Sequence, residues 1–301
     1  MMSKPHASLS LMKLFARYLF TALILVSLYF ASASNARELP TIAPEKVGVS
    51  SSRLEKIDRM AAQYVENGHY SGIVTLVARK GKVIHLNASG NYGIDNQTPM
   101  AADTLFRIYS MTKPVTAIAA MILYEEGKFH MTDPVSKHLP EFAEQKILID
   151  GELVSPKSPM TMRQLFTHTA GLTYGWTRDN PVDIQYADAG LFASADLAEF
   201  TKKVAALPLR FQPGTRYHYS VSLDLLGAIV ERLSGVPLDE FFASRIFKPL
   251  GMVDTFFNVP ADKLQRLASD QYWDYENGKI ALVAEANKRA YQNVTLFSGG
   301  G

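Results

Sequence analysis

The chain has 301 residues, of which 47% are hydrophobic and 20% are charged, which is the balance of a folded globular protein. Its formal net charge of +2 gives no basis for a nucleic-acid-binding surface, so nucleic acid is not expected as a partner. The absence of cysteine excludes disulfides, cysteine nucleophiles, iron–sulfur clusters and zinc–thiolate sites.

The first 33 residues have the pattern of a secretory signal peptide. Residues 1–17 carry three basic side chains and no acid, an apolar run follows at 19–31, and Ala31-Ser32-Ala33 is a small-x-small cleavage pattern. The sequence therefore predicts removal of residues 1–33 and a periplasmic or secreted protein. An uncleaved membrane anchor is the alternative, but a run of 13 residues is shorter than the roughly 20 of a spanning helix. No stable membrane span is expected after cleavage.

The first part of the mature chain has the pattern of a helix followed by a hairpin. Apolar residues recur at helical spacing over 49–67, which predicts a helix that ends at an Asn-Gly pair. Two β-rich runs at 72–79 and 82–88 flank Lys80-Gly81, which predicts two strands joined by a tight turn.

The middle of the chain is predicted to be a mostly helical lobe, roughly residues 115–260. The stretch 109–127 is too apolar for a solvent-exposed helix and is expected to be a buried central helix. Periodicity between Pro- and Gly-containing breaks predicts further helices at 161–169, 195–206, 222–234 and 238–247. A last hairpin is predicted at 270–284, where Asn277-Gly278 is a preferred pair for a two-residue type I′ turn.

Ser110-Met-Thr-Lys113 stands at the head of the predicted buried helix and could supply a nucleophile and its base. Residues three apart share one helix face, so the Lys113 amine can reach the Ser110 hydroxyl, and burial favours the neutral amine that could take its proton. The pattern alone is not specific, because Ser10 and Lys13 match it too. A helix-capping serine and a surface lysine are the alternative interpretations. The sequence has no HExxH zinc helix, phosphate-binding P-loop or GxSxG nucleophile elbow.

Longer segments carry a resemblance to a known family. Leu105–Ala117 resembles the nucleophile box of the β-lactamase and penicillin-binding-protein superfamily of serine hydrolases, and Pro213–Val221, running into Leu223–Gly227, resembles its second box. Lesser similarities lie at Leu165–Leu172, Ser234–Pro237 and Ile246–Met252. The resemblance implies an α+β fold, namely a three-layer α/β/α sandwich with an antiparallel sheet and a mostly helical lobe. It also implies a reaction without a metal or organic cofactor.

Within this resemblance, three residues take catalytic roles. Ser110 would be the acylated nucleophile, Lys113 its activating base, and Tyr219 a proton shuttle between the lysine and the leaving group. The Ser110 backbone N–H would be one oxyanion donor, with a second from a strand. Outside the resemblance, Tyr219 would be a core or turn tyrosine, since the chain has 14 tyrosines and Tyr217 lies two positions away.

A Gly/Asp/Pro-rich segment at 171–191 is predicted to be a loop near the site. Its aromatic residues Tyr174, Trp176 and Tyr186 could line a substrate pocket, or could simply pack.

The chain departs from the family pattern at its end, where the third box, Lys or His followed by Thr or Ser and Gly, is not found. His168-Thr-Ala-Gly171 is superficially similar but precedes Tyr219, and is predicted to end a helix and pack. The run Ser298–Gly301 is predicted to be flexible, and resembles the point where relatives continue into further strands. We therefore expect residues 34–301 to be an incomplete hydrolase domain that lacks its C-terminal strands. Exposed strand edges would leave it unstable or inactive, without a cooperative transition in circular dichroism melting.

A second departure bears on the substrate. Val221 stands where lactam-directed members commonly have an asparagine that holds the substrate amide, and Tyr-Ser-Val is more similar to the esterase-like branch. The sequence therefore predicts an exported serine hydrolase that acts through an acyl-enzyme on small esters, or on lactam or amide substrates. A β-lactamase and a D-alanyl-D-alanine carboxypeptidase are alternatives within the enzyme class. A non-catalytic peptidoglycan-binding module, or a truncated inactive homologue, is the alternative of another class.

Overall fold

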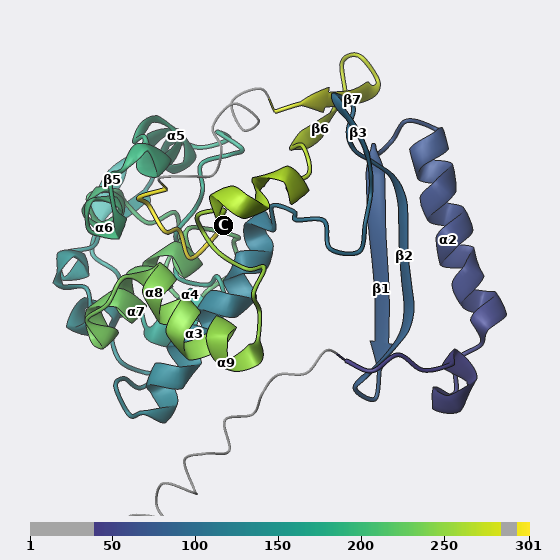
Figure 1. Cartoon of the computed structure of the whole chain (residues 1–301). Helices are drawn as coiled ribbons and strands as arrows, with labels where there is room; N and C mark the ends of the chain where they lie inside the picture. The colour runs from purple at the N-terminus through teal and green to yellow at the C-terminus, as the bar shows by residue number, and fades with distance from the viewer. Residues whose placement is uncertain (1–38, 284–293) are drawn as a thin grey trace, which may run out of the picture.

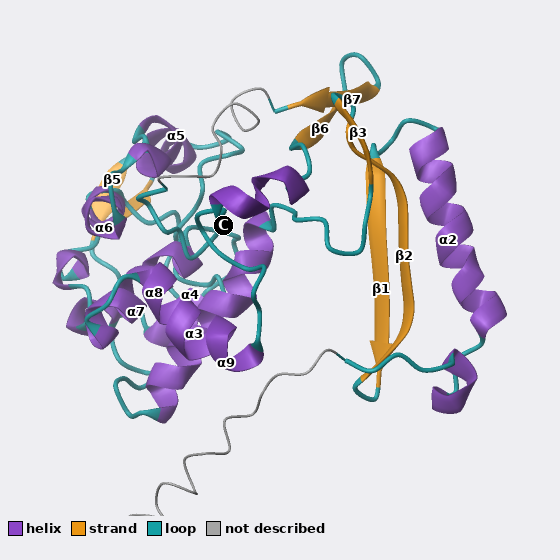
Figure 2. Ribbon diagram, viewed as in Figure 1, coloured by secondary structure: helices purple, strands orange, loops and turns teal. Residues whose placement is uncertain are grey.

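The computed structural model describes residues 39–283 and 294–301, so the predicted signal peptide lies outside the described residues. Residues 39–99 form a sheet part and residues 109–260 form a helical lobe (Figures 1 and 2). Figure 1 shows one helix, the sheet and the lobe in that order, in a mixed α/β fold with an antiparallel sheet as predicted. Within the described ranges, no helix is long and apolar enough to cross a membrane.

One helix covers a three-stranded antiparallel sheet in the sheet part. Helix α2 (Ser51–Glu66) precedes β1 (Gly72–Arg79), β2 (Lys82–Gly93) and β3 (Asn96–Pro99), and the strands pair in the order β1-β2-β3. These bounds confirm the predicted helix and the predicted hairpin. The third strand, β3, was not predicted.

The β1–β2 turn has the geometry that its sequence favours. Lys80 and Gly81 both have positive φ, 52° and 67°, and Arg79 pairs directly with Lys82 across them. Two central residues with positive φ form the turn whose twist matches that of antiparallel strands.

The core of the sheet part is small. Leu54 of α2 packs with Val47 and Ile84 in a cluster of three buried residues, to which partly buried neighbours add. On the opposite side of the pleat, Leu76 and Leu86 pair across the strands and are 58% and 49% exposed. Only one face of the sheet is therefore covered by described residues.

The helical lobe is built around two long helices that pack against each other, α3 (Thr112–Glu125) and α7 (Ser222–Ser234). Every α7 residue from Ser222 to Val230 is buried, because α4, α6 and α8 also pack on this helix. The remaining predicted helices are confirmed as α4 (Met162–Phe166), α6 (Leu197–Ala205) and α8 (Leu238–Phe242). Helix α8 continues through a π-helical turn, η6 (Ala243–Phe247), into α9 (Lys248–Leu250). Short 3₁₀ turns occur at η1 (Pro44–Val47), η2 (Tyr109–Met111), η3 (Val135–Lys137), η4 (Pro140–Phe142), η5 (Leu191–Ala193) and η7 (Ala261–Arg266).

Besides β3, one helix and one hairpin were not predicted. Helix α5 (Pro181–Asp188) lies inside the expected loop 171–191, and β4 (Ile147–Ile149) pairs with β5 (Glu152–Val154) around Asp150-Gly151. Both had local signals: an Asn-Pro start for the helix, and an Asp-Gly pair for the hairpin.

The last hairpin is present, but its predicted turn is wrong. Strands β6 (Gln271–Asp274) and β7 (Lys279–Leu282) pair, and Asp274 lies opposite Lys279, so four residues form the loop. Gly278 alone among these four has positive φ, whereas a type I′ turn needs it at two residues. The Asp274 carboxylate accepts backbone N–H groups of Glu276 and Asn277 and thereby stabilises the wider turn.

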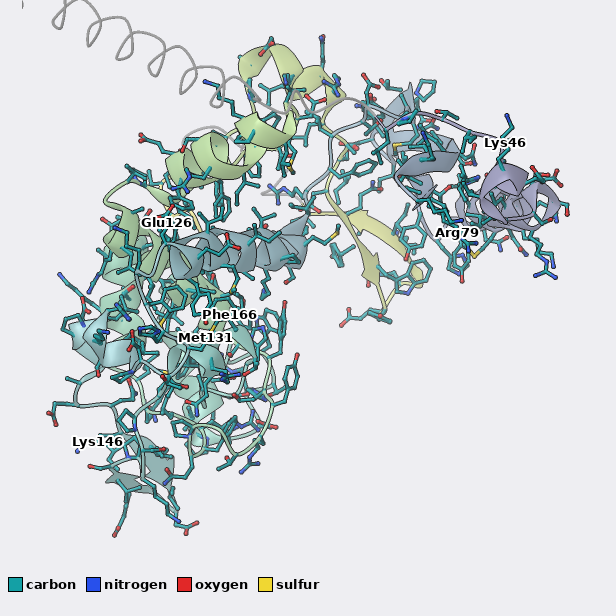
Figure 3. All side chains as sticks on the ribbon, turned by 90° about the horizontal axis from the view of Figure 1, so that it is seen from below. Lys46, Arg79, Glu126, Met131, Lys146 and Phe166 are labelled. Atoms are coloured by element: carbon teal, nitrogen blue, oxygen red, sulfur yellow. The ribbon has the colours of Figure 1, made fainter. Side chains whose placement is uncertain are left out.

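The β6–β7 hairpin lies between the sheet part and the helical lobe. The Trp273 ring stacks on His69 with centroids 5.3 Å apart, and the Gln271 amide donates to Ser71 Oγ at 2.7 Å, so the hairpin docks on the end of α2 and the start of β1. Seen from below in Figure 3, Lys46 and Arg79 lie in the sheet part, whereas Glu126, Met131 and Phe166 lie in the lobe.

Candidate active site

Ser110 lies in η2, the turn that leads into α3, and its side chain is exposed. Tyr109, directly before it, has a φ of +42°, a conformation that is unfavourable for a side chain other than glycine. Such backbone strain is concentrated at functional sites. The Tyr109 hydroxyl donates to the Asp270 carboxylate, which also pairs with Arg107 at 2.7 Å, and these contacts hold the turn in place.

Lys113 lies one turn further along, and its side chain points back to the serine. Its Nζ lies 3.1 Å from Ser110 Oγ and donates to the Gly300 carbonyl at 2.6 Å, and the residue is 8% exposed. The same nitrogen lies 4.6 Å from the ring centroid of Tyr219. The buried lysine therefore has its amine confined beside the serine.

Tyr219 comes from the loop before α7 and completes the group. Its hydroxyl donates to Ser110 Oγ at 2.6 Å, so both Tyr219 and Lys113 lie within hydrogen-bond distance of the serine oxygen. The structure thus brings together the three residues for which the sequence predicted catalytic roles.

Ser298, Gly299 and Gly300 of the glycine run at the end of the chain are buried, contrary to the flexible run predicted. Gly300 and Gly299 direct carbonyl oxygens at Lys113 Nζ and Thr116 Oγ1, and a Cβ on either glycine would overlap Asp224 or the Leu223 carbonyl. Glycine is needed because the backbone approaches α3 and α7 too closely for a side chain. The run was predicted to be flexible because this close approach depends on the tertiary structure, which the local sequence does not show.

Asp224 of α7 is a fully buried carboxylate beside this run. It accepts hydrogen bonds from Tyr174 Oη at 3.1 Å, from the Gly300 N–H at 3.2 Å and from Ser298 Oγ. Burial raises the pKa of the Asp224 carboxyl, and the bond from Ser298 and the charge of Lys113 partly oppose that rise. Burial, with the nearby Asp224, also raises the pKa of the Tyr174 hydroxyl, which keeps it a donor. The sequence analysis did not single out Asp224, since nothing local marks it.

The three aromatic residues predicted for a substrate pocket lie in two different places. Tyr174 and Trp176 stack with centroids 4.3 Å apart, and their rings lie 5.5 Å and 6.0 Å from Tyr219. Trp176 is 70% exposed and so borders the site on its open side. Tyr186 is a correction to the prediction: it is 2% exposed on α5 and packs in the lobe core, so its ring does not line the site.

A cavity of about 770 Å³ includes Tyr109 of the nucleophile turn in its lining. Tyr109, Arg107 and Asp270 line it near the serine, and Trp273 and Tyr70 line it near the sheet part. In residues 39–283 and 294–301, no three acidic or histidine side chains are grouped so that they could hold a metal ion. The side chains within hydrogen-bond distance of one another at the nucleophile are those of Ser110, Lys113 and Tyr219.

Comparisons with known proteins agree with this geometry. Protein Rv1367c from Mycobacterium tuberculosis is 39% identical and esterase EstB from Burkholderia gladioli is 35% identical, each over 207 residues that make up 67% of this chain. The chain spans about half, 51%, of the length of these curated relatives. The structure of EstCE1, described as a hydrolase with promiscuous acyltransferase activity, superposes with a TM-score of 0.70 at 30% identity, over 83% of this chain and 68% of that one. The Beta-lactamase family model matches residues 57–298. The chain therefore belongs to the β-lactamase family.

Proposed function

We propose that the protein is an exported serine esterase that acts on small esters through an acyl-enzyme. The observation that carries the proposal is the position of Ser110 Oγ, which lies 3.1 Å from Lys113 Nζ and 2.6 Å from Tyr219 Oη. A nucleophile within hydrogen-bond reach of both a base and a second proton carrier is the arrangement that acyl transfer requires.

In the first step Ser110 Oγ attacks the ester carbonyl carbon while its proton passes to the Lys113 amine. The tetrahedral oxyanion would be held by the Ser110 backbone N–H. The bond from carbon to the alkoxy oxygen then breaks, and the Tyr219 hydroxyl protonates the departing alcohol and regains a proton from Lys113. Water attacks the acyl-enzyme in the second step, releases the carboxylic acid and returns the proton to Ser110.

Two observations support esters over lactams and peptides. Val221 is fully buried in the lobe core, so the residue two positions after Tyr219 presents no amide to a substrate. The relative named esterase EstB is 35% identical over 207 residues of this chain. A β-lactamase or D-alanyl-D-alanine carboxypeptidase would use the same acylation step, so the experiment must separate the acyl donors.

The test is intact-mass spectrometry of the full chain after separate incubation with a fluorophosphonate, a p-nitrophenyl ester and a penicillin. We expect a phosphonyl adduct, and an acyl adduct or turnover with the ester, both lost in Ser110→Ala. A lasting penicilloyl adduct with no ester turnover would instead identify a penicillin-binding enzyme. A folded chain that forms no adduct would contradict the proposal and favour a binding module.

Export is a separate part of the proposal, which rests on the basic, apolar and small-residue pattern of residues 1–33. N-terminal sequencing of the protein recovered from a bacterial periplasm should begin at Ser34. A chain that keeps Met1 and sediments with membranes would show the anchored form instead.

A further inference from the structure

His168 occupies a backbone conformation that favours glycine. It follows α4 with a φ of +53°, its N–H donates to the Leu165 carbonyl, and the next N–H, of Thr169, donates to the Gln164 carbonyl. This pair of bonds is the helix ending in which glycine usually supplies the left-handed residue. A histidine here is unfavourable for the local backbone, which points to a use for its side chain.

Both neighbours of Tyr219 in the chain are bonded to this one residue. The His218 N–H donates to the His168 carbonyl at 2.8 Å, and the Ser220 N–H donates to His168 Nδ1 at 3.2 Å. The imidazole also lies against Tyr219 itself, with ring centroids 4.8 Å apart. The backbone carbonyl and the ring of His168 therefore each accept a hydrogen bond from the loop, one on either side of the tyrosine.

The protonation state of the ring suits this contact. The pKa of His168 is lowered to about 4, mainly by burial and to a smaller extent by the charges of Lys113 and His218. The imidazole is therefore neutral near pH 7. Because Nδ1 accepts the Ser220 N–H, the ring proton lies on Nε2.

We propose that His168 is a positioning residue that holds the Tyr219 hydroxyl on Ser110 Oγ by accepting the Ser220 N–H at Nδ1. The inference rests on the proposed esterase function, since it concerns the proton carrier of that reaction. His168 touches neither Ser110 nor a reacting atom in this scheme. Without the hydrogen bond from the Ser220 N–H to His168 Nδ1, the loop that carries Tyr219 can shift. A displacement of about 1 Å of a catalytic group can cost roughly a hundredfold in rate.

Two substitutions separate the side chain from the backbone. Asparagine tolerates positive φ, and its Oδ1, bonded to Cγ as Nδ1 is, can accept the same Ser220 N–H, so His168→Asn retains the proposed contact without the ring. Glycine relaxes the backbone but has no acceptor, so His168→Gly removes the contact while favouring the local fold. Asp150→Gly is the matched control, because Asp150 also has a positive φ, 49°, in a hairpin turn far from Ser110 in the chain.

The measurement is the rate of fluorophosphonate labelling of the full chain at saturating probe, together with its thermal melting. We expect His168→Gly to melt no lower than the wild type and to label about 10- to 100-fold more slowly. His168→Asn should label within roughly a few-fold of the wild type, as expected when one hydrogen bond is conserved. Asp150→Gly should label at the wild-type rate.

Three outcomes would overturn the inference. His168→Gly labelling at the wild-type rate would show that the ring positions nothing. A folded His168→Asn that labels about 10- to 100-fold more slowly than the wild type would show that the acceptor at Nδ1 is not the cause, and this outcome decides the matter even if His168→Gly fails to fold. A wild-type chain that is not labelled, compared with Ser110→Ala, would instead reject the esterase proposal and the inference with it.

Discussion

The hydroxyl of Ser110 accepts a hydrogen bond from Tyr219 and lies beside the amine of Lys113, so the two partners can be removed one at a time. Tyr219→Phe keeps the ring that packs on His168 and removes the hydroxyl alone. General acid–base groups contribute about 10²- to 10⁴-fold, so we expect a loss of ester turnover in that range with unchanged melting. Tyr217→Phe is the control, because Tyr217 is 65% exposed and lies two positions before Tyr219 in the same loop. Equal turnover by Tyr219→Phe and the wild type would remove Tyr219 from the mechanism.

His168 also makes stability depend on pH. Its pKa is about 4 in the folded protein and 6.5 in the reference state, so between these values the unfolded chain binds a proton that the native chain does not. Stability from this group is therefore complete above about pH 6.5 and falls as the pH decreases toward 4. Urea titrations at pH 7 and pH 4.5 should show this loss in the wild type and a smaller one in His168→Asn. An equal loss in both would assign the effect to other groups.

At the scale of elements, the patterns that repeat along the chain were predicted, whereas the short helix α5 was not. α2 and α7 have long apolar stripes, whereas α5 has a short one and begins at Asn180, whose Oδ1 accepts the Val182 and Asp183 N–H groups at 3.0 Å and 3.1 Å. A short helix depends on such a cap because so few of its backbone groups are bonded internally.

Removing this cap should therefore lower stability. Asn180→Ala leaves two N–H groups without their acceptor and should cost about 1 kcal/mol in the free energy of unfolding, whereas Asn180→Ser, which can still cap, should cost less. Urea denaturation followed by circular dichroism checks the difference. Equal stabilities of the two variants would mean that packing alone holds α5.

The glycine run at the end of the chain contributes a backbone contact to the candidate active site. Gly300→Ala would place a Cβ against the Asp224 carboxylate and push the Gly300 carbonyl away from Lys113 Nζ. We expect fluorophosphonate labelling to slow by at least about tenfold, because the amine loses an orienting acceptor. Gly278→Asn is the control, since Gly278 has open space around it and asparagine tolerates its positive φ. Labelling at the wild-type rate by Gly300→Ala would show that this contact does not orient Lys113.

At the scale of the whole molecule, the buried apolar residues are distributed unevenly between the helical lobe and the sheet part. The helical lobe holds one large buried cluster that includes most of α7, whereas the cluster of the sheet part has three fully buried members, Val47, Leu54 and Ile84. β1 lies at the edge of its sheet, and Leu76 and Leu86 are exposed on the uncovered face. Parts with few buried contacts open at lower free energy than well-packed cores.

Hydrogen exchange should reveal this difference. We expect amides of β1 and β2 to exchange well before those of Ser222–Val230 in α7, through an opening that leaves the lobe folded. Mass spectrometry of exchanged peptides at neutral pH measures it, and melting would then show two steps or a broad transition. Equal protection of the two parts would indicate a single cooperative unit and would contradict this assignment.

The sequence by itself determined what short-range patterns encode. Period and composition predicted α2, the β1–β2 hairpin and the long helices of the lobe, and the Ser-x-x-Lys spacing placed Ser110 and Lys113 on one helix face, because such contacts join residues a few positions apart. Tyr219 was identified through family resemblance alone, since its bond to Ser110 spans 109 residues. The tertiary structure decided the rest. It brings Lys113 into contact with Gly300, which is 187 positions away in the chain, and it buries Asp224 and Tyr186. It also places His168 where its ring accepts a hydrogen bond from the loop that carries Tyr219. These features depend on how helices and loops distant in the chain pack together, and no local pattern records that packing.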